Sequence, residues 1–355
     1  MNLGRVFFIA LLFLGFGNAQ AQTVQMVPPS FKAKVPVPTA YFIGPKVDNA
    51  TEREKAEKDR SLYNDKKWRF GKEIAVNLSY FDNAERHIQP NGDVIYQFGI
   101  RLKSALSTSL ILDDFYLAEG ASLFLTDAAR TTSIGAYTAA NNNEAKVLGT
   151  EVLFSDDAVL VVYEPREVVG KSTLTIRTAV HGFENVNHLG DLILKSLNSS
   201  GDCHYDVNCP VSDGWRNQIN SVAMIMDGGG LCTGSLVYNT SGNVIPYFLS
   251  ARHCGVQPSN WVFRFGWEAP ASASRCAQVG DSGNGTQIQN VNGAILRAEN
   301  NTSDFLLMEL NSDPNPSWGI YYNGWDKSDS SNVSSAVGIH HPDGDLKKFS
   351  QENDP

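Results

Sequence analysis

Cysteine is absent from the first 202 residues of this 355-residue chain. The five cysteines all lie in one later stretch and are Cys203, Cys209, Cys232, Cys254 and Cys276. This distribution divides the chain into a cysteine-free part and a cysteine-containing part. An odd number of cysteines leaves one thiol without an intrachain partner if the others form disulfides.

Positive charge and long apolar runs are also scarce. Lys and Arg total 29 against 38 Asp and Glu, and the net charge of −9 argues against a nucleic-acid partner, because no basic cluster could neutralise a run of phosphates. After residue 21, no stretch approaches the roughly 20 apolar residues that span a bilayer, so we expect no membrane anchor.

Residues 1–21 have the pattern of a secretory signal peptide. Arg5 supplies a basic start, residues 6–16 form a short apolar run, and Ala19-Gln20-Ala21 is a small-x-small cleavage site. We therefore expect export, to the extracellular space or the periplasm.

Metal-ligand patterns are weak as well. His340 and His341 are adjacent, so on a strand their rings point to opposite faces. Cys203, His204 and Cys209 lack a second pair at zinc-site spacing. We expect neither a metal nor a cofactor, although His340 or His341 could line a substrate cleft.

Residues 22–65 are rich in Pro, Lys, Glu and Asp, which favours a leader or linker with at most a short helix. Between 66 and 195, short apolar runs alternate with turn residues, a pattern typical of a β-sandwich. The predicted strands are 73–78, 94–102, 109–115, 122–126, 150–154, 158–163 and 172–179. His87 and His181 stand alone there, as surface or packing residues, so this part is predicted to be a pro-domain or a binding module.

Residues 196–355 are again β-like, with short predicted strands and long loops. These strands are 220–226, 231–238, 247–250, 261–267, 294–297 and 304–310. The pattern favours a β-barrel that carries its functional residues on loops. The whole chain is therefore predicted to be all-β. Lys195 lies in the polar link between the two parts, where proteolysis commonly acts.

One segment has the residue pattern of a catalytic site. An apolar strand at 247–250 leads to His253 and Cys254. Cys254 can be tied by a disulfide to Cys232, which would fix the loop that carries the imidazole. Histidine suits the role of a general base, because its ordinary pKa of about 6.5 lets it accept and return a proton near neutral pH.

The segment from Cys232 to Val237, followed by a strand that ends in Ala251-Arg252-His253-Cys254, resembles the chymotrypsin-like serine peptidases. The resemblance is closer to the lysyl endopeptidase group and covers residues 203–355. Further motifs appear in the same order: Cys203 with Cys209-Pro210, Asp213-Gly214, Tyr247-Phe248-Leu249, His253-Cys254-Gly255, Ser303-Asp304-Phe305-Leu306-Leu307, Gly324-Trp325-Asp326 and Ile339-His340-His341-Pro342.

This resemblance implies a β-sandwich pro-domain followed by a chymotrypsin-like β-barrel protease domain that is incomplete at its C-terminus. It implies His253 as general base and Asp304 as the carboxylate that orients it. The function implied is that of a secreted serine endopeptidase precursor that cleaves proteins or peptides after Lys.

The resemblance also implies disulfides that join Cys209 to Cys276 and Cys232 to Cys254. Cys203 would pair with a sixth cysteine downstream, so we expect it to be unpaired in this chain.

The nucleophile is the missing part of the pattern. Ser282 lies in Gly280-Asp281-Ser282-Gly283, which copies the surroundings of a reactive serine, but it falls between His253 and Asp304 rather than after both. We therefore expect the nucleophilic serine beyond residue 355 and expect the chain as given to be inactive. The alternative is a non-catalytic pseudoprotease, or a binding protein built on the sandwich. If the complete enzyme cleaves after Lys, it could cut its own precursor at Lys195.

Overall fold

The computed structural model describes residues 27–63, 67–184, 200, 204–268, 276, 289–328 and 333–353. Four predictions concern residues outside these ranges: the signal segment 1–21, Lys195, Cys203 and Ser282. Within the described ranges, no helix is long and apolar enough to cross a membrane.

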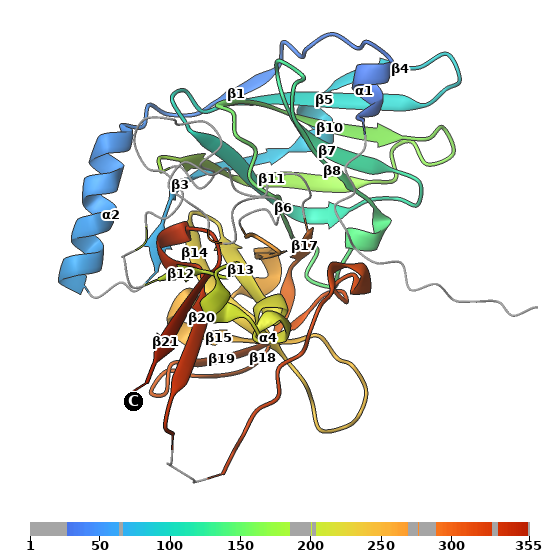
Figure 1. Ribbon diagram of the computed structural model, residues 1–355. Helices are drawn as coiled ribbons and strands as arrows, with labels where there is room; N and C mark the ends of the chain where they lie inside the picture. Colours follow the sequence, from blue (N-terminus) through green and yellow to red (C-terminus); the bar gives the residue numbers. More distant parts are fainter. Residues whose placement is uncertain are drawn as a thin grey trace, which may run out of the picture.

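Two sheets form the part of the molecule that precedes residue 183 (Figure 1). The first has the order β1-β5-β10-β7-β8, with β4 added beside β5, and the second has the order β3-β11-β6-β9. Strand β1 runs parallel to β5, and the other pairs are antiparallel. The strands are β1 (Tyr41–Ile43), β3 (Gly71–Ser79), β4 (Glu85–Ile88), β5 (Val94–Arg101), β6 (Ser107–Tyr116), β7 (Ser122–Asp127), β8 (Ser133–Tyr137), β9 (Leu148–Gly149), β10 (Asp157–Glu164) and β11 (Thr173–Gly182).

The core of this sandwich lies between the two sheets. Leu112 of β6, Leu125 of β7 and Leu160 of β10 are fully buried in one apolar cluster to which both sheets contribute. On the other face of β10, Val159 and Val161 are buried in a second cluster. Burial on both faces explains why β10 is a continuous apolar run rather than an alternating one.

A curled sheet forms most of the second part, with the order β17-β16-β13-β14-β15-β19-β18. Strands β17 and β18, at its two ends, are consecutive in the chain and are separated by Gly293, whose φ is +73°. The sheet therefore curls so that one chain segment supplies both of its ends. The strands are β13 (Val222–Asp227), β14 (Gly230–Val237), β15 (Tyr247–Ala251), β16 (Val262–Phe265), β17 (Gln289–Asn292), β18 (Ala294–Asn300) and β19 (Phe305–Leu310).

A small third sheet has the order β12-β21-β20 and lies beside the curled sheet (Figure 1). Its strands are β12 (Tyr205–Asp206), β20 (Ala336–His340) and β21 (Lys348–Glu352). The short helices are α1 (Pro29–Lys32), α3 (Tyr80–Asn83) and α4 (Arg216–Ser221). Trp68 and Arg69 form strand β2, which pairs with β14 of the curled sheet although it lies just ahead of β3 in sequence.

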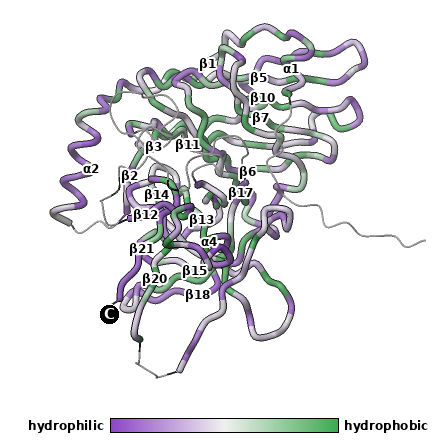
Figure 2. Tube along the Cα trace, in the orientation of Figure 1, coloured by the Kyte–Doolittle hydropathy of each residue, from purple (hydrophilic) through white to green (hydrophobic). Residues whose placement is uncertain are grey.

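The longest helix is α2 (Asn49–Tyr63), which is hydrophilic along most of its length (Figure 2). It is rich in Ala, Glu, Lys and Arg, residues with high helix propensity. Asp48 caps its first turn, because the Asp48 carboxylate accepts a 2.8 Å hydrogen bond from the backbone N–H of Thr51. Arg60 forms a 2.9 Å ion pair with Asp343, so the helix bridges to the second part of the chain.

The sandwich and the curled sheet share a buried contact. Glu151 of the sandwich is fully buried and accepts hydrogen bonds from Arg264 Nε and Asn290 Nδ2, both at 3.1 Å. Beside it, Asn292 donates to the carbonyl of Gly149 at 2.8 Å. The apolar cluster at this contact draws on both parts of the chain: Phe70, Val152, Met224, Met226, Leu231, Val262, Trp267 and Leu346. The two parts are therefore packed together through a common core.

The all-β prediction is confirmed, but several short strands, such as β4, β8, β20 and β21, are absent from the predicted set. Further segments differ from their predicted structure. Residues 41–43, expected in a leader, form a strand of the sandwich, and residues 49–63 form a long helix. Residues 150–154 form only an isolated bridge at Leu153, because Glu151 and Val152 turn towards the curled sheet. The predicted strand 220–226 begins as helix α4 and becomes β13 only at Val222.

Candidate active site

His253 lies in a single turn at the end of strand β15. The strand ends at Ala251, and residues 252–254 form one turn of 3₁₀ helix. Gly255 follows with φ +123°, a conformation that residues with a side chain rarely adopt. The sequence thus delivers the imidazole to the edge of the sheet and then turns the chain away sharply.

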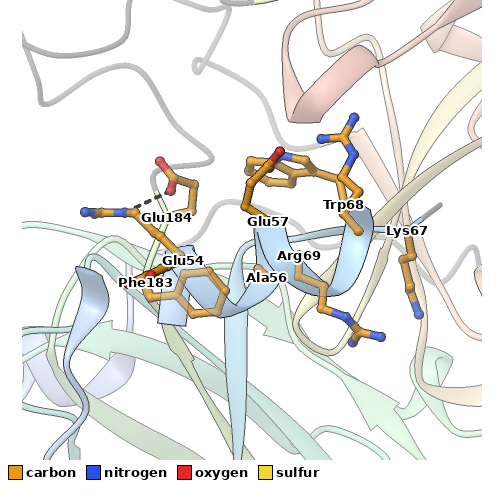
Figure 3. Close-up of a pocket in the computed structure, with 10 residues that line it drawn as sticks. Glu54, Ala56, Glu57, Lys67, Trp68, Arg69, Phe183 and Glu184 are labelled. Atoms are coloured by element: carbon orange, nitrogen blue, oxygen red, sulfur yellow. Dashed lines mark ion pairs between the residues drawn. The ribbon is translucent and has the colours of Figure 1, made fainter. Parts of the chain in front are cut away.

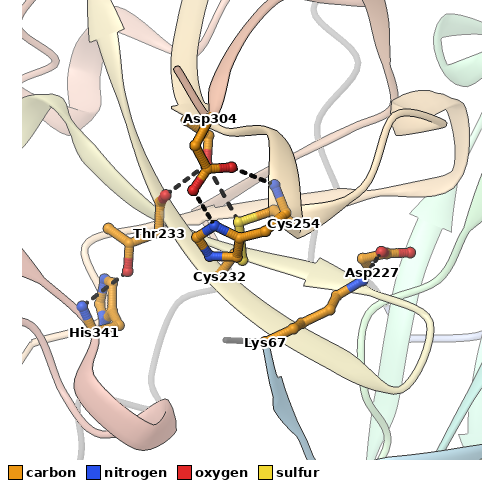
Figure 4. The surroundings of a disulfide bond; sticks show 9 residues. Lys67, Asp227, Cys232, Thr233, Cys254, Asp304 and His341 are labelled. Carbon is orange, nitrogen blue, oxygen red and sulfur yellow. Dashed lines mark hydrogen bonds and ion pairs between the residues drawn. A yellow bond between two sulfur atoms is a disulfide. The ribbon is translucent and has the colours of Figure 1, made fainter. Parts of the chain in front are cut away.

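Asp304 meets His253 because strands β15 and β19 are paired. Ala251, the last residue of β15, lies opposite Phe305, the first residue of β19, so the turn before β19 meets the turn after β15. The Nδ1 atom of His253 is 2.6 Å from Asp304 Oδ2, and the backbone N–H of His253 donates to Asp304 Oδ1 at 2.8 Å (Figure 4). Two hydrogen bonds therefore fix the carboxylate relative to the ring.

The backbone of Asp304 is itself constrained. Its φ is +54°, in the left-handed region, and its carbonyl accepts a 3.0 Å hydrogen bond from the backbone N–H of Arg252. Strained residues of this kind cluster at functional sites. The side chains of His253 and Asp304 are 33% and 37% exposed, so the pair is accessible from solvent.

A disulfide joins Cys232 to Cys254 directly beside the imidazole (Figure 4). Cys232 is in strand β14, so the bond ties the turn that carries His253 to the neighbouring strand. Ser250 adds a second tie, because its hydroxyl donates to the carbonyl of Thr233 at 2.8 Å. The position of the imidazole is therefore set by covalent and hydrogen-bonded links on both sides.

His340 and His341 differ in burial. His341 is only 7% exposed, and its backbone N–H donates to Thr233 Oγ1 at 3.0 Å. Burial and the nearby charge of Lys347 lower the pKa of His341 well below its ordinary value. His340 is partly buried and stacks edge-on against His204 at 5.0 Å, where burial and His204 lower its pKa. His341 therefore has the environment of a packing residue, and of the two histidines suggested to line a cleft, His340 is the more exposed.

A buried charged cluster behind His341 was missed by sequence reasoning. Lys348 is fully buried and pairs with Asp206 at 2.6 Å and with Asp345 at 3.6 Å. Lys347 pairs with Glu268 at 3.1 Å. Burial lowers the pKa of Lys347, and its carboxylate partner partly offsets this shift. Two adjacent lysines ordinarily indicate an exposed loop, so the sequence held no signal for their burial.

The other predicted cysteine pair is also a disulfide, which joins Cys209 to Cys276. Both disulfides are the pairs expected from the sequence. Among the described residues, the one group with metal-ligand spacing is Cys232, His253 and Cys254. Both of its sulfur atoms are in the disulfide, so they cannot act as thiolate ligands. His181 is fully buried and 2.8 Å from Asn49, as a packing residue would be.

An antiparallel sheet that curls on itself and carries a hydrogen-bonded histidine and aspartate on its loops is typical of the chymotrypsin-like fold. Residues 197–355 match the family described as lysyl endopeptidase, C-terminal domain. A lysyl endopeptidase of Pseudomonas aeruginosa is 31% identical over 191 residues, which cover 47% of this chain and 39% of that protein. The second part of the chain is thus similar to lysyl endopeptidases, and the chain spans less than half the length of this relative.

Proposed function

We propose that this chain is the precursor of a secreted serine endopeptidase in which His253 is the general base and Asp304 orients it. The observation that carries the proposal is the pair of hydrogen bonds from the Nδ1 atom and the backbone N–H of His253 to the two oxygens of Asp304. A proton on Nδ1, held by the carboxylate, leaves Nε2 as the atom that accepts a proton.

The reaction would be acyl transfer. A serine hydroxyl, which the proposal places outside the described residues, would attack the peptide carbonyl while Nε2 of His253 takes its proton. The imidazolium would then protonate the leaving amine, and Asp304 would stabilise the charged ring throughout. Water would then attack the acyl carbonyl while Nε2 of His253 takes its proton, and the imidazolium would return a proton to the serine oxygen as the bond to the acyl group breaks.

The comparisons and the first residues support the proposed substrate and location. Similarity to lysyl endopeptidases supports protein or peptide substrates that are cleaved after Lys. The signal-like segment 1–21 supports secretion.

Two substitutions in the complete gene product test the catalytic assignment. Asp304→Asn should lower kcat by about 10⁴-fold, because the imidazole loses the acceptor that fixes its tautomer, and His253→Ala should be at least as severe. Hydrolysis of a Lys-containing chromogenic peptide measures both. Asp313→Asn, at an exposed position in the same part, is the matched control and should retain activity. A folded product without hydrolysis would favour the non-catalytic alternative.

The precursor state is tested separately. We propose that the sandwich, residues 66–195, is a pro-domain released by cleavage after Lys195. N-terminal sequencing of the mature secreted enzyme should then begin at Ser196. Active enzyme that begins at Gln22 would rule out removal of the sandwich as an activation step.

A further inference from the structure

Strand β2 lies on the edge of the strand that carries the site disulfide. Trp68 pairs with Leu231 and Arg69 pairs with Gly230, in antiparallel register. The next backbone N–H, that of Phe70, donates to the carbonyl of Gly229 at 2.8 Å. An extended segment that adds to a strand edge through backbone bonds is a common mode of peptide recognition. Segment 67–70 therefore binds the curled sheet as an added peptide strand would.

The edge that receives this segment is close to His253. Leu231 directly precedes Cys232, whose disulfide partner Cys254 directly follows His253. A peptide strand on this edge therefore lies beside the turn that carries the imidazole.

Lys67 places a positive charge in the same region. Its ammonium group forms an ion pair with Asp227 at the end of strand β13, and the two side chains are only 12% and 20% exposed (Figure 4). A Cβ atom on Gly255 would lie 3.3 Å from the Asp227 carboxylate. Asp227 therefore holds a basic side chain against the turn that contains His253.

Three consecutive glycines make room for the segment. A side chain on Gly230 would overlap the methylene groups of Lys67, and one on Gly229 would overlap the backbone of Gly71. Gly228 has φ +51°, which turns the hairpin between β13 and β14. The hairpin 227–231 is thus shaped to admit another backbone, with a carboxylate at one end.

The opposite side of residues 68 and 69 borders a pocket. A pocket of about 430 Å³ lies between α2 and β2, and Lys67, Trp68 and Arg69 form part of its wall (Figure 3). Arg69 is exposed and Trp68 is only half-buried. Residues 68 and 69 are therefore seated on the hairpin beside this pocket, whereas Phe70 is buried in the core that the two parts share.

We propose that hairpin 227–231 is a binding subsite for an extended peptide with a lysine side chain, which Asp227 recognises, and that segment 67–70 occupies it in this chain. The assignment of this subsite to a substrate groove rests on the proposed function as an endopeptidase. The ligand class is a basic peptide in strand conformation, bound by backbone hydrogen bonds and one ion pair.

The test uses the full chain and the labelled peptide Lys-Trp-Arg-Phe-Gly, the sequence of residues 67–71, read by fluorescence anisotropy. Lys67→Glu puts a negative charge against Asp227 and should weaken the binding of the chain's own residues 67–69 to the hairpin. This variant should bind the labelled peptide at least tenfold more tightly than wild type, in which the tethered segment competes at high effective concentration. Lys103→Glu, at an exposed position of the sandwich, is the matched control and should bind like wild type.

The role of Asp227 is isolated by a second comparison in the Lys67→Glu background. A peptide with norleucine in place of lysine should bind about tenfold more weakly, the size expected for a hydrogen bond to a charged group. Adding Asp227→Asn should abolish this discrimination. Equal binding of the two peptides before Asp227→Asn, or discrimination that persists after it, would overturn the proposal.

A third measurement is made with segment 67–70 still bound to hairpin 227–231. In the wild-type chain, acetylation of Lys67 by acetic anhydride should be at least tenfold slower than that of the exposed Lys103, and Asp227→Asn should remove the protection. Equal rates in wild type would contradict the proposal even if Lys67→Glu fails to fold. Because these measurements do not depend on hydrolysis, peptide binding that survives His253→Ala would stand even if the complete gene product were inactive.

Discussion

The sandwich and the curled sheet are stabilised in different ways. The sandwich has no cysteine, and its core between the sheets is a single large apolar cluster. The second part has two disulfides, and every buried lysine or arginine among the described residues belongs to it: Arg264, Lys347 and Lys348. One part therefore relies on apolar packing, and the other adds covalent and ionic links.

The difference follows from where the candidate site lies. His253 and Asp304 are on turns that project from the ends of strands, and turns bury little apolar surface. Links such as the Cys232–Cys254 disulfide hold those turns where packing cannot. The comparison teaches that the disulfide beside His253 holds a turn that packing leaves unsupported, whereas Arg264 and Lys348 form their ion pairs at the contact with the sandwich and in the third sheet.

The largest effect should come from breaking the most deeply buried charge pair between the two parts, that of Glu151 with Arg264. Glu151→Ala leaves Arg264 buried without its carboxylate, which should lower the free energy of unfolding by about 4 kcal/mol. Urea unfolding followed by tryptophan fluorescence measures the loss. Glu119→Ala, at an exposed turn of the sandwich, is the control and should cost less than about 0.5 kcal/mol, as surface substitutions usually do. A cost below about 1 kcal/mol for Glu151→Ala would mean that the contact is not a stabilising joint.

A smaller loss should follow removal of the disulfide at the site. Cys232→Ala with Cys254→Ala frees a loop whose ends are 22 residues apart, for which chain entropy predicts about 3 kcal/mol. The loss should be confined to the second part, so hydrogen exchange measured by mass spectrometry should rise in strands β14 and β15 and stay unchanged in β10. Equal loosening of β10 would show that the two parts do not differ in the way described.

The smallest of these effects concerns pH. Burial, with a contribution from Lys347, holds the pKa of His341 well below its ordinary value of 6.5. A depressed folded-state pKa contributes stability that is full above pH 6.5 and is lost as the pH falls below it, because the unfolded chain binds the proton first. As the pH falls from 8 to 5.5, protonation of this group should lower the free energy of unfolding by about 1.4 kcal/mol.

His341→Gln replaces the histidine with a side chain that does not titrate. The free energy of unfolding of this variant should therefore depend less on pH between 6.5 and 5.5. Its constant cost is read from urea unfolding at pH 8, where the wild-type histidine is neutral in both states. An unchanged slope between pH 6.5 and 5.5 would show that His341 does not set the acid sensitivity of the second part.

The sequence was sufficient for the features that depend on local pattern. Alternating and continuous apolar runs located most strands of both parts, and the ordered motifs around His253, Asp304 and the cysteines pointed to residues that the structure brings together. Local pattern could not predict that residues 68–69 leave the sandwich to pair with β14, because strand pairing across the two parts depends on distant residues. Nor could it predict the burial of Lys347 and Lys348, whose partners Glu268 and Asp206 lie far away in sequence.

The shared apolar cluster has a consequence for the solubility of the second part. Phe70 and Val152 cover a surface that contains Met224, Met226 and Val262. Lifting the sandwich away would bring these side chains into contact with water as a contiguous apolar patch, and patches of that kind favour aggregation unless another surface replaces the cover. During synthesis the sandwich emerges first, so the curled sheet would fold against a cover that is already in place.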